Sequence, residues 1–197
     1  MADDVSLRFS HLGGAPVVDL VNTVSWRLDP HRRSDKLQTF SDVVAWAAES
    51  GLIDDDDAGR LQRTAPATAE RELARVIALR EAVYDAGLLR SRDAADRIRV
   101  LAAAALRDAV ASDLGDRWGW RFAPTPESVA HRLALEAAAL LTSELASHIA
   151  QCSDDACGWV FLDTTPRRNR KWCSSADCGN RNRVRTHAAR RRSRTDV

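Results

Sequence analysis

Lysine, cysteine and long apolar runs are scarce in this sequence, and the lack of apolar runs argues against membrane-spanning and exported proteins. Of its 29 basic residues only Lys36 and Lys171 are lysine, and its 197 residues include four cysteines and one methionine. The longest apolar stretches, such as residues 102–106, are far too short to cross a bilayer. Residues 1–8 include two aspartates and no apolar run of the kind that export signals contain. We therefore expect a soluble, cytoplasmic protein with no membrane association.

Catalytic signatures are also missing from the sequence. Its five histidines are scattered, and it contains no Ser/His/Asp, Cys/His or phosphate-loop pattern. Acid–base chemistry by a pair of carboxylates is the enzymatic option that the sequence leaves open. We therefore expect a binding protein and not an enzyme.

The four cysteines form two short-spaced pairs in the last quarter of the chain. They read Cys152-x4-Cys157 and, after fifteen residues, Cys173-x4-Cys178. Two such pairs, separated by about the length of a hairpin, are typical of a tetrahedral zinc site. Two disulfides are the alternative, but structural disulfides are rare in a reducing compartment. We expect one zinc ion per chain, held by all four cysteines. A purely structural zinc with no nucleic acid nearby is a further alternative.

The net charge of +1 hides a division along the chain. Residues 1–150 contain 18 basic and 23 acidic residues, whereas residues 151–197 contain 11 and 5. A basic end on an acidic body indicates a polyanionic partner for the end alone. Joined to the spacing of the four cysteines, the basic end predicts double-stranded DNA as the partner of the C-terminal part.

Apolar periodicity predicts a mainly helical body with a little sheet. Ser41 and Thr125 are suitable N-caps, and Gly51 is suited to follow a helix end. A Gly13-Gly14 turn predicts a short N-terminal hairpin, with which residues 117–122 pair as a further strand. The expected helices are 42–50, 54–63, 69–90, 93–112 and 126–149.

We expect two domains, a helical one over residues 1–150 and a treble-clef-like zinc finger over residues 151–197. In the finger, residues 158–163 and 170–172 are expected to form a hairpin between the two cysteine pairs. A helix then begins at about Gly179, and its N-terminus offers N–H donors and a favourable dipole to the thiolates. On this helix Val184 and Ala188 are four residues apart and are expected to face the hairpin.

Basic side chains of the finger are the candidate DNA contacts. Some of these arginines could instead offset the charge of the thiolates, and residues 190–197 could be a solvated tail. The candidates are Arg167, Arg168, Arg170, Lys171, Arg181, Arg183, Arg185, Arg190 and Arg192. An alternative function is an RNA- or protein-binding module, in which Trp159, Phe161 and Trp172 are contact residues and not core.

A small-ligand pocket in the body is a further hypothesis. Asp19, Asn22 and Trp26 share a helical face, and Arg80 lies within the apolar stripe of its helix. A cation in that position needs a partner or a ligand. With nearby tryptophans these four residues could bind a small anionic or aromatic effector. The alternative is a structural ion pair between Arg80 and Asp19.

A regulator that reads a palindromic site needs two fingers, so we also expect a homodimer. The candidate interface is helix 126–149. Its apolar stripe is equally explained by the core of the body.

Two stretches of the finger resemble the CGNR zinc finger of bacteria, namely Cys157-Gly-Trp-Val-Phe-Leu-Asp163 and Lys171-Trp-Cys-Ser-Ser-Ala-Asp-Cys-Gly-Asn-Arg181. Gly14-Ala-Pro-Val-Val-Asp19-Leu-Val-Asn-Thr23 and Leu79-Arg-Glu-Ala-Val-Tyr84 are similar to the ABATE domain that precedes that finger. The resemblance implies zinc at the four cysteines, DNA binding through the finger, and a role as a stress-related transcriptional regulator. Ser175 is a departure, because methionine is expected there, but it is not a zinc ligand.

Overall fold

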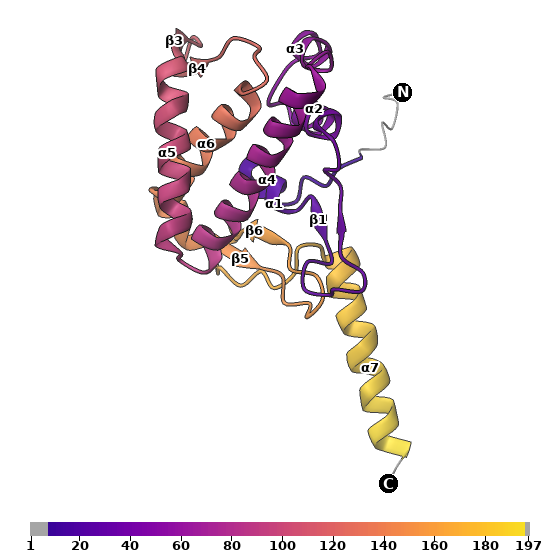
Figure 1. The fold of residues 1–197 in the computed structure, drawn as a ribbon. Coiled ribbons are helices and arrows are strands. Elements are labelled where there is room, and N and C mark those ends of the chain that lie inside the picture. Colours follow the sequence, from indigo (N-terminus) through magenta and orange to yellow (C-terminus); the bar gives the residue numbers. More distant parts are fainter. Residues whose placement is uncertain (1–7, 196–197) are drawn as a thin grey trace, which may run out of the picture.

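Helices make up most of the molecule, and six short strands pair two by two in the part that the structure describes (Figure 1). The computed structural model describes the backbone of residues 8–195 and the side chains of residues 8–191. Its α-helices are α1 (Pro16–Val21), α2 (Phe40–Glu49), α3 (Asp55–Leu61), α4 (Pro66–Leu88), α5 (Arg92–Asp108), α6 (Ser128–Leu141) and α7 (Asn180–Thr195). The antiparallel pairs are β1 (Val24–Ser25) with β2 (Ser34–Asp35), β3 (Val110–Asp113) with β4 (Trp118–Arg121), and β5 (Ile149–Gln151) with β6 (Val160–Leu162). The predicted fold class, mainly α with a little sheet and a C-terminal zinc finger, is confirmed.

The core of the body lies between α4, α5 and α6, with α1 and α2 packed on α4. Val76 of α4, Ile98 of α5 and Leu133 of α6 are fully buried in one apolar cluster, which also contains Trp46 of α2. The helical spacing of these apolar residues is what turns each stripe inward. Among residues 8–195, no helix is both long and apolar enough to span a membrane.

The predicted N-terminal hairpin is wrong, because this segment turns into α1. Gly14, at φ +90°, makes the turn, and Pro16 then occupies the first helical position, where its missing N–H costs no hydrogen bond. The segment pairs with the finger and not with itself, since the Leu162 N–H donates to the Gly13 carbonyl at 2.8 Å.

Three other boundaries differ from the prediction. Thr39, and not Ser41, caps α2, because its hydroxyl accepts from the Asp42 N–H while the Asp42 carboxylate accepts from the Thr39 N–H. The strand within 117–122 forms, but its partner is β3, which was predicted to be helical. The predicted helix 126–149 stops at Leu141, and a 3-10 turn over Glu144–His148 leads into β5.

β6 joins the finger to the body. Val160 and Leu162 point into the core of the body, whereas Phe161, between them, packs on the four cysteines. The partner of β6 is β5, so the predicted return strand 170–172 is wrong. Because alternate residues of one strand face opposite sides, the core of the body and the cysteine cluster are two clusters that share β6 as a common wall.

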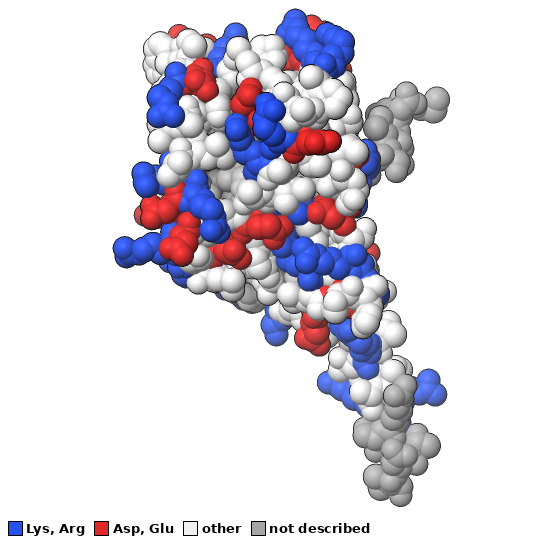
Figure 2. Space-filling model, in the orientation of Figure 1, with Lys and Arg blue, Asp and Glu red and all other residues white. Residues whose placement is uncertain are grey.

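α7 leaves the finger and extends away from the body (Figure 1). On the face shown in Figure 2, basic and acidic side chains are interspersed over the body. Residues 183–191 of α7 are exposed, and Val184, which was predicted to face a hairpin, has 61% of its surface exposed. That prediction is wrong, and the side of α7 that meets the finger carries arginine instead.

Candidate metal centre and basic helix

The four cysteines meet in one buried cluster. Their sulfur atoms all lie within 4.8 Å of one another, with Cys157 Sγ 3.7 Å and Cys178 Sγ 3.5 Å from Cys173 Sγ. Four sulfurs at about 2.3 Å from a tetrahedral Zn²⁺ would be about 3.8 Å apart, whereas a disulfide needs about 2.05 Å. All four thiols are free and buried. The cluster therefore fits one zinc ion, and the alternative of two disulfides is excluded.

Two backbone turns present the sulfurs. In the first, the Cys157 N–H donates to the Asp154 carbonyl (3.0 Å), and Gly158 follows at φ +72°. A Cβ at Gly158 would lie 2.7 Å from Arg27 Cβ, so only glycine allows this approach of the body. In the second, the Ser174 hydroxyl accepts from the Asp177 N–H and caps a π-helical turn, Ser175–Gly179, that continues into α7. α7 thus starts at the metal ligands.

Two positive groups can compensate the negative charge of the thiolates, namely a bound metal ion and arginine side chains. Burial raises the pKa of the Cys178 thiol, and a hydrogen bond with the Cys152 sulfur raises the pKa of Cys173. A bound Zn²⁺ deprotonates coordinating thiols outright and leaves four thiolates with net negative charge. Arg181 Nη2 lies 2.8 Å from Cys178 Sγ, and Arg170 Nη2 donates to the Cys173 carbonyl at 2.7 Å. The Arg170 guanidinium also lies 4.0 Å from the Phe161 ring centroid.

Asp154 holds the start of α7 against the first cysteine turn. Its carboxylate is only 1% exposed and accepts from Arg185 Nη2 at 2.9 Å, with Arg181 Nε at 3.5 Å. Its other oxygen accepts from the Ala156 N–H. Arg181 and Arg185, one helical turn apart, therefore form the side of α7 that faces the finger.

Asp154→Asn should loosen α7 at its start, because it removes a buried charge from two arginines. We expect a loss of about 1–2 kcal/mol, discounted because both guanidinium groups reach solvent. Trypsin cleavage within α7 measures this, and it should be several-fold faster than in the wild type. Asp155→Asn is the matched control, since Asp155 is exposed. Equal cleavage rates in the two variants would show that Asp154 does not anchor the helix.

Asp163 shapes the basic turn between the cysteine pairs. It accepts from the Thr165 hydroxyl (2.7 Å) and from the backbone N–H groups of Thr165 (3.0 Å) and Arg170 (2.8 Å). The hydrogen bond from the Thr165 hydroxyl is the main cause of a lowered pKa for Asp163. Its support of the turn is therefore present above the ordinary aspartate range and is lost as the pH falls through the lowered value.

Four of the predicted DNA contacts make hydrogen bonds within the finger. Arg170, Arg181 and Arg185 hold the finger together, and Arg183 Nη2 donates to the Ser175 carbonyl at 3.1 Å. The side chain of Arg192 lies outside the described residues. Arg183 and Arg185 are exposed despite these contacts, and so are Arg167, Arg168, Lys171 and Arg190.

The four residues predicted to form a ligand pocket serve different contacts. Asp19 accepts from the Gly13 N–H, Asn22 exchanges two hydrogen bonds with Val160 of β6, and Trp26 faces the finger. The predicted ion pair between Arg80 and Asp19 is wrong, because Arg80 binds elsewhere. Its side chain, 2% exposed, donates to the Asp35 carboxylate at 2.8 and 2.7 Å and also to Glu81 and Thr23.

Two features were not predicted from the sequence, namely the contacts of Asp154 with the start of α7 and the contact of Trp26 with the finger. An aspartate two residues after a cysteine ligand is a usable signal for the first. We find no sequence signal for the second, which depends on contacts between distant segments.

Both parts of the chain match models of known protein families. The family model described as "Putative stress-induced transcription regulator" (ABATE) matches residues 14–144, and the CGNR zinc finger model matches residues 148–191. The comparison with curated proteins gave no match. The four cysteines lie inside the second matched segment, and the order of the two segments is the one that the sequence resemblance predicted. The chain therefore belongs to the ABATE family, and residues 148–191 are a CGNR zinc finger.

Proposed function

We propose that this protein is a transcription regulator that binds double-stranded DNA through its zinc finger and α7. The observation that carries the proposal is α7 itself. Seven of its sixteen residues are arginine and none is acidic, and it extends away from the body (Figures 1 and 2). Arginines neutralise DNA phosphates, and a single α-helix fits the major groove. Zinc supports this role by fixing the start of the helix.

A second group of cations adds to the same interface. Arg167, Arg168 and Lys171 are exposed on the turn that Asp163 holds. Phosphate contacts from an ordered turn fix the position of a protein on the duplex, whereas side chains of a helix in the groove read bases. We therefore assign the turn to phosphate contacts and α7 to the groove.

Truncation after Ala189 should weaken binding to duplex DNA by at least tenfold at low salt. It removes Arg190, Arg191, Arg192 and Arg194, and each lost phosphate contact lowers the slope of log affinity against log salt by about one. Fluorescence anisotropy with a random duplex pool across a salt series measures both effects.

The matched control removes the same number of charges from the body, by alanine at four exposed arginines of α5. These are Arg92, Arg97, Arg99 and Arg107. The control should bind almost as the wild type does. An equal loss of DNA affinity in both variants would show that α7 contributes only net charge. Unchanged affinity in the truncated protein would contradict DNA binding through α7.

An RNA- or protein-binding module is the second candidate function. Its predicted contact residues do not favour it, because Phe161 is fully buried and Trp159 and Trp172 pack on the cysteine cluster. The Trp159 indole N–H also donates to the Val24 carbonyl at 3.0 Å. Competition between single-stranded RNA and duplex DNA distinguishes the two candidates, and we expect the duplex to win.

We further propose a cytoplasmic homodimer whose body senses a small effector and has no enzymatic activity. The dimer surface must lie outside the predicted stripe of α6, since Val129, Leu133 and Ala137 are buried in the core of the body. Sedimentation with and without DNA tests the dimer. A thermal-shift screen of the full chain tests the effector, because a ligand at about 100 times its dissociation constant adds about 2.7 kcal/mol.

A further inference from the structure

Trp26 lies between the body and the finger in a backbone conformation that is uncommon for a large side chain. Its φ is +53°, in the left-handed region, which bulky residues occupy where surrounding contacts hold them. The residues that follow bind the first cysteine turn: the Arg27 N–H donates to the Cys157 carbonyl (2.9 Å), and the Leu28 N–H donates to the Ala156 carbonyl (3.3 Å).

The ring of Trp26 contacts the arginine nearest the cysteines. Arg181 Cζ lies 4.5 Å from the centroid of the ring, within the range of a cation–π contact, and Arg32 Cζ lies 3.9 Å from it. Arg181 is in the first turn of α7, and it reaches Cys178 Sγ of the second cysteine turn and the Asp154 carboxylate of the first. One ring of the body thus touches the side chain that ties α7 to both cysteine turns.

A small cavity of about 180 Å³ lies beside this contact. Trp26, Trp159 and Arg181 form part of its wall, and Cys157, Cys173 and Cys178 line it as well. The contact between the Trp26 ring and Arg181 therefore lies beside three of the candidate metal ligands.

We propose that Trp26 is a positioning residue, through which the body fixes the direction of α7. Its ring holds Arg181 against Cys178 and Asp154, and Arg181 in turn holds the first turn of the helix. Movement of the loop 26–33 would release Arg181, loosen the zinc site and free α7. The inference rests on the proposed DNA binding for its consequence, but the contact itself is testable without DNA.

The test compares three full-length variants with the wild type. Trp26→Gly removes the ring, and glycine suits the positive φ, so the fold of the body is retained. Trp26→Phe keeps an aromatic face and serves as the rescue, and Trp118→Ala is the control, because Trp118 is 73% exposed on β4. The readouts are the rate of zinc release to a chelator and the affinity for a random DNA duplex.

We expect Trp26→Gly to release zinc about tenfold faster and to bind DNA about tenfold more weakly, with the thermal unfolding of the body unchanged. Tenfold corresponds to about 1.4 kcal/mol, which is the size of a partly desolvated cation–π contact. Trp26→Phe should recover most of both losses, and Trp118→Ala should show neither.

A double-mutant cycle with Arg181→Ala separates positioning from general destabilisation. If the ring acts through Arg181, adding Trp26→Gly to Arg181→Ala should change zinc release little further. Additive effects, or unchanged zinc release in Trp26→Gly, would overturn the inference. If the wild type binds no DNA, the proposed function fails, whereas the zinc-release cycle still decides whether Trp26 holds Arg181.

Discussion

Cys173→Ser and Cys178→Ser should each abolish zinc binding and unfold the finger. All four sulfurs are needed to surround the ion, and a structural zinc contributes on the order of 10 kcal/mol to a domain of this size. Elemental analysis should give one zinc per chain for the wild type and none for either variant. Ser153→Ala, at an exposed position beside Cys152, should keep both zinc and fold.

The same substitutions should also weaken the body, because β6 belongs to both cores. Val160 and Leu162 are buried in the body, and each such side chain contributes about 1.5–3 kcal/mol when buried. Urea unfolding followed by near-UV tryptophan signals should show a loss of at least about 3 kcal/mol in the body. A cysteine variant that keeps its zinc would contradict the assigned ligands, and a body of unchanged stability would show that the two cores are independent.

Asp35→Asn should destabilise the body by about 3 kcal/mol, more than the loss of its partner Arg80 does. Burial lowers the pKa of Arg80, but the hydrogen bonds to Asp35 and Glu81 outweigh it and raise that pKa overall, so the side chain is charged. Removing the carboxylate charge of Asp35 leaves a buried guanidinium with too little compensation. Arg80→Met instead leaves two carboxylates that reach water, and we expect it to cost only about 1–2 kcal/mol.

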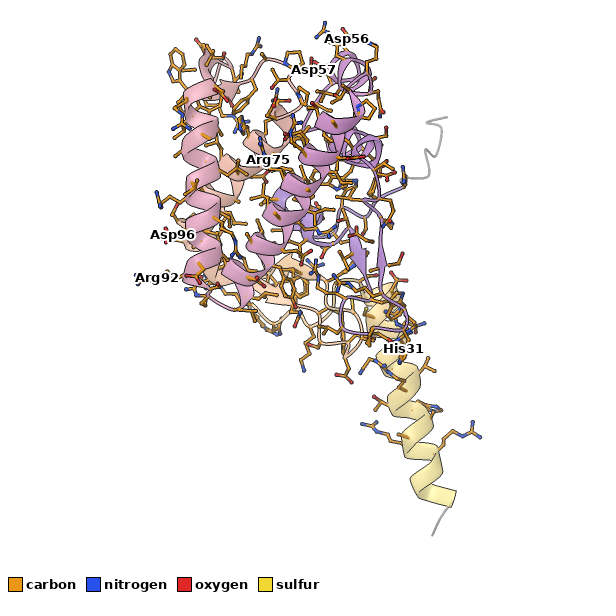
Figure 3. The ribbon with its side chains drawn as sticks, viewed as in Figure 1. His31, Asp56, Asp57, Arg75, Arg92 and Asp96 are labelled. Atoms are coloured by element: carbon orange, nitrogen blue, oxygen red, sulfur yellow. The ribbon has the colours of Figure 1, made fainter. Side chains whose placement is uncertain are left out.

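Denaturant unfolding of both variants tests this asymmetry. Arg99→Ala is the control, because the Arg99–Asp96 pair is exposed on α5 and should contribute less than about 0.5 kcal/mol. Asp96 is visible on the outer face of α5 in Figure 3. If Arg80→Met proved the more damaging variant, the guanidinium would be stabilised mainly by packing and not by its charge partners.

The zinc ligands and the long helices were predictable from sequence because both depend on local spacing. The cysteine pairs identify a metal site through the distances between ligands along the chain, whatever the rest of the fold does. α4 and α5 follow from apolar stripes, which the folded body buries as the 3.6-residue period requires.

The errors in strand pairing and in the partner of Arg80 concern contacts between distant segments. The partner of β6 is β5, which precedes the first cysteine pair. The hairpin expected between the two cysteine pairs therefore does not form. The apolar stripe around Arg80 predicted a need for a partner, and Asp19 was the expected one, but the pairing of β1 with β2 brings Asp35 to Arg80. Which strands pair is decided by contacts between distant segments, and the local pattern of one strand does not specify its partner.

The finger helix shows the same limit on a smaller scale. Apolar spacing predicted that Val184 would face inward, but the buried Asp154 selects Arg181 and Arg185 instead. A carboxylate that is 1% exposed requires charged partners. Leaving it unpaired would cost more free energy than leaving the side chain of Val184 in water. Only the structure shows that Asp154 is buried.

A single titration shows whether a zinc-bound finger presents α7 to DNA. Fluorescence anisotropy of a labelled random duplex should be measured with the zinc-loaded full chain, at low and at physiological salt. We expect binding that weakens steeply with salt, with a dissociation constant of about 10⁻⁴–10⁻⁶ M at physiological salt, and that is lost when zinc is removed. No binding by the zinc-loaded protein at low salt, or equal binding without zinc, would contradict it.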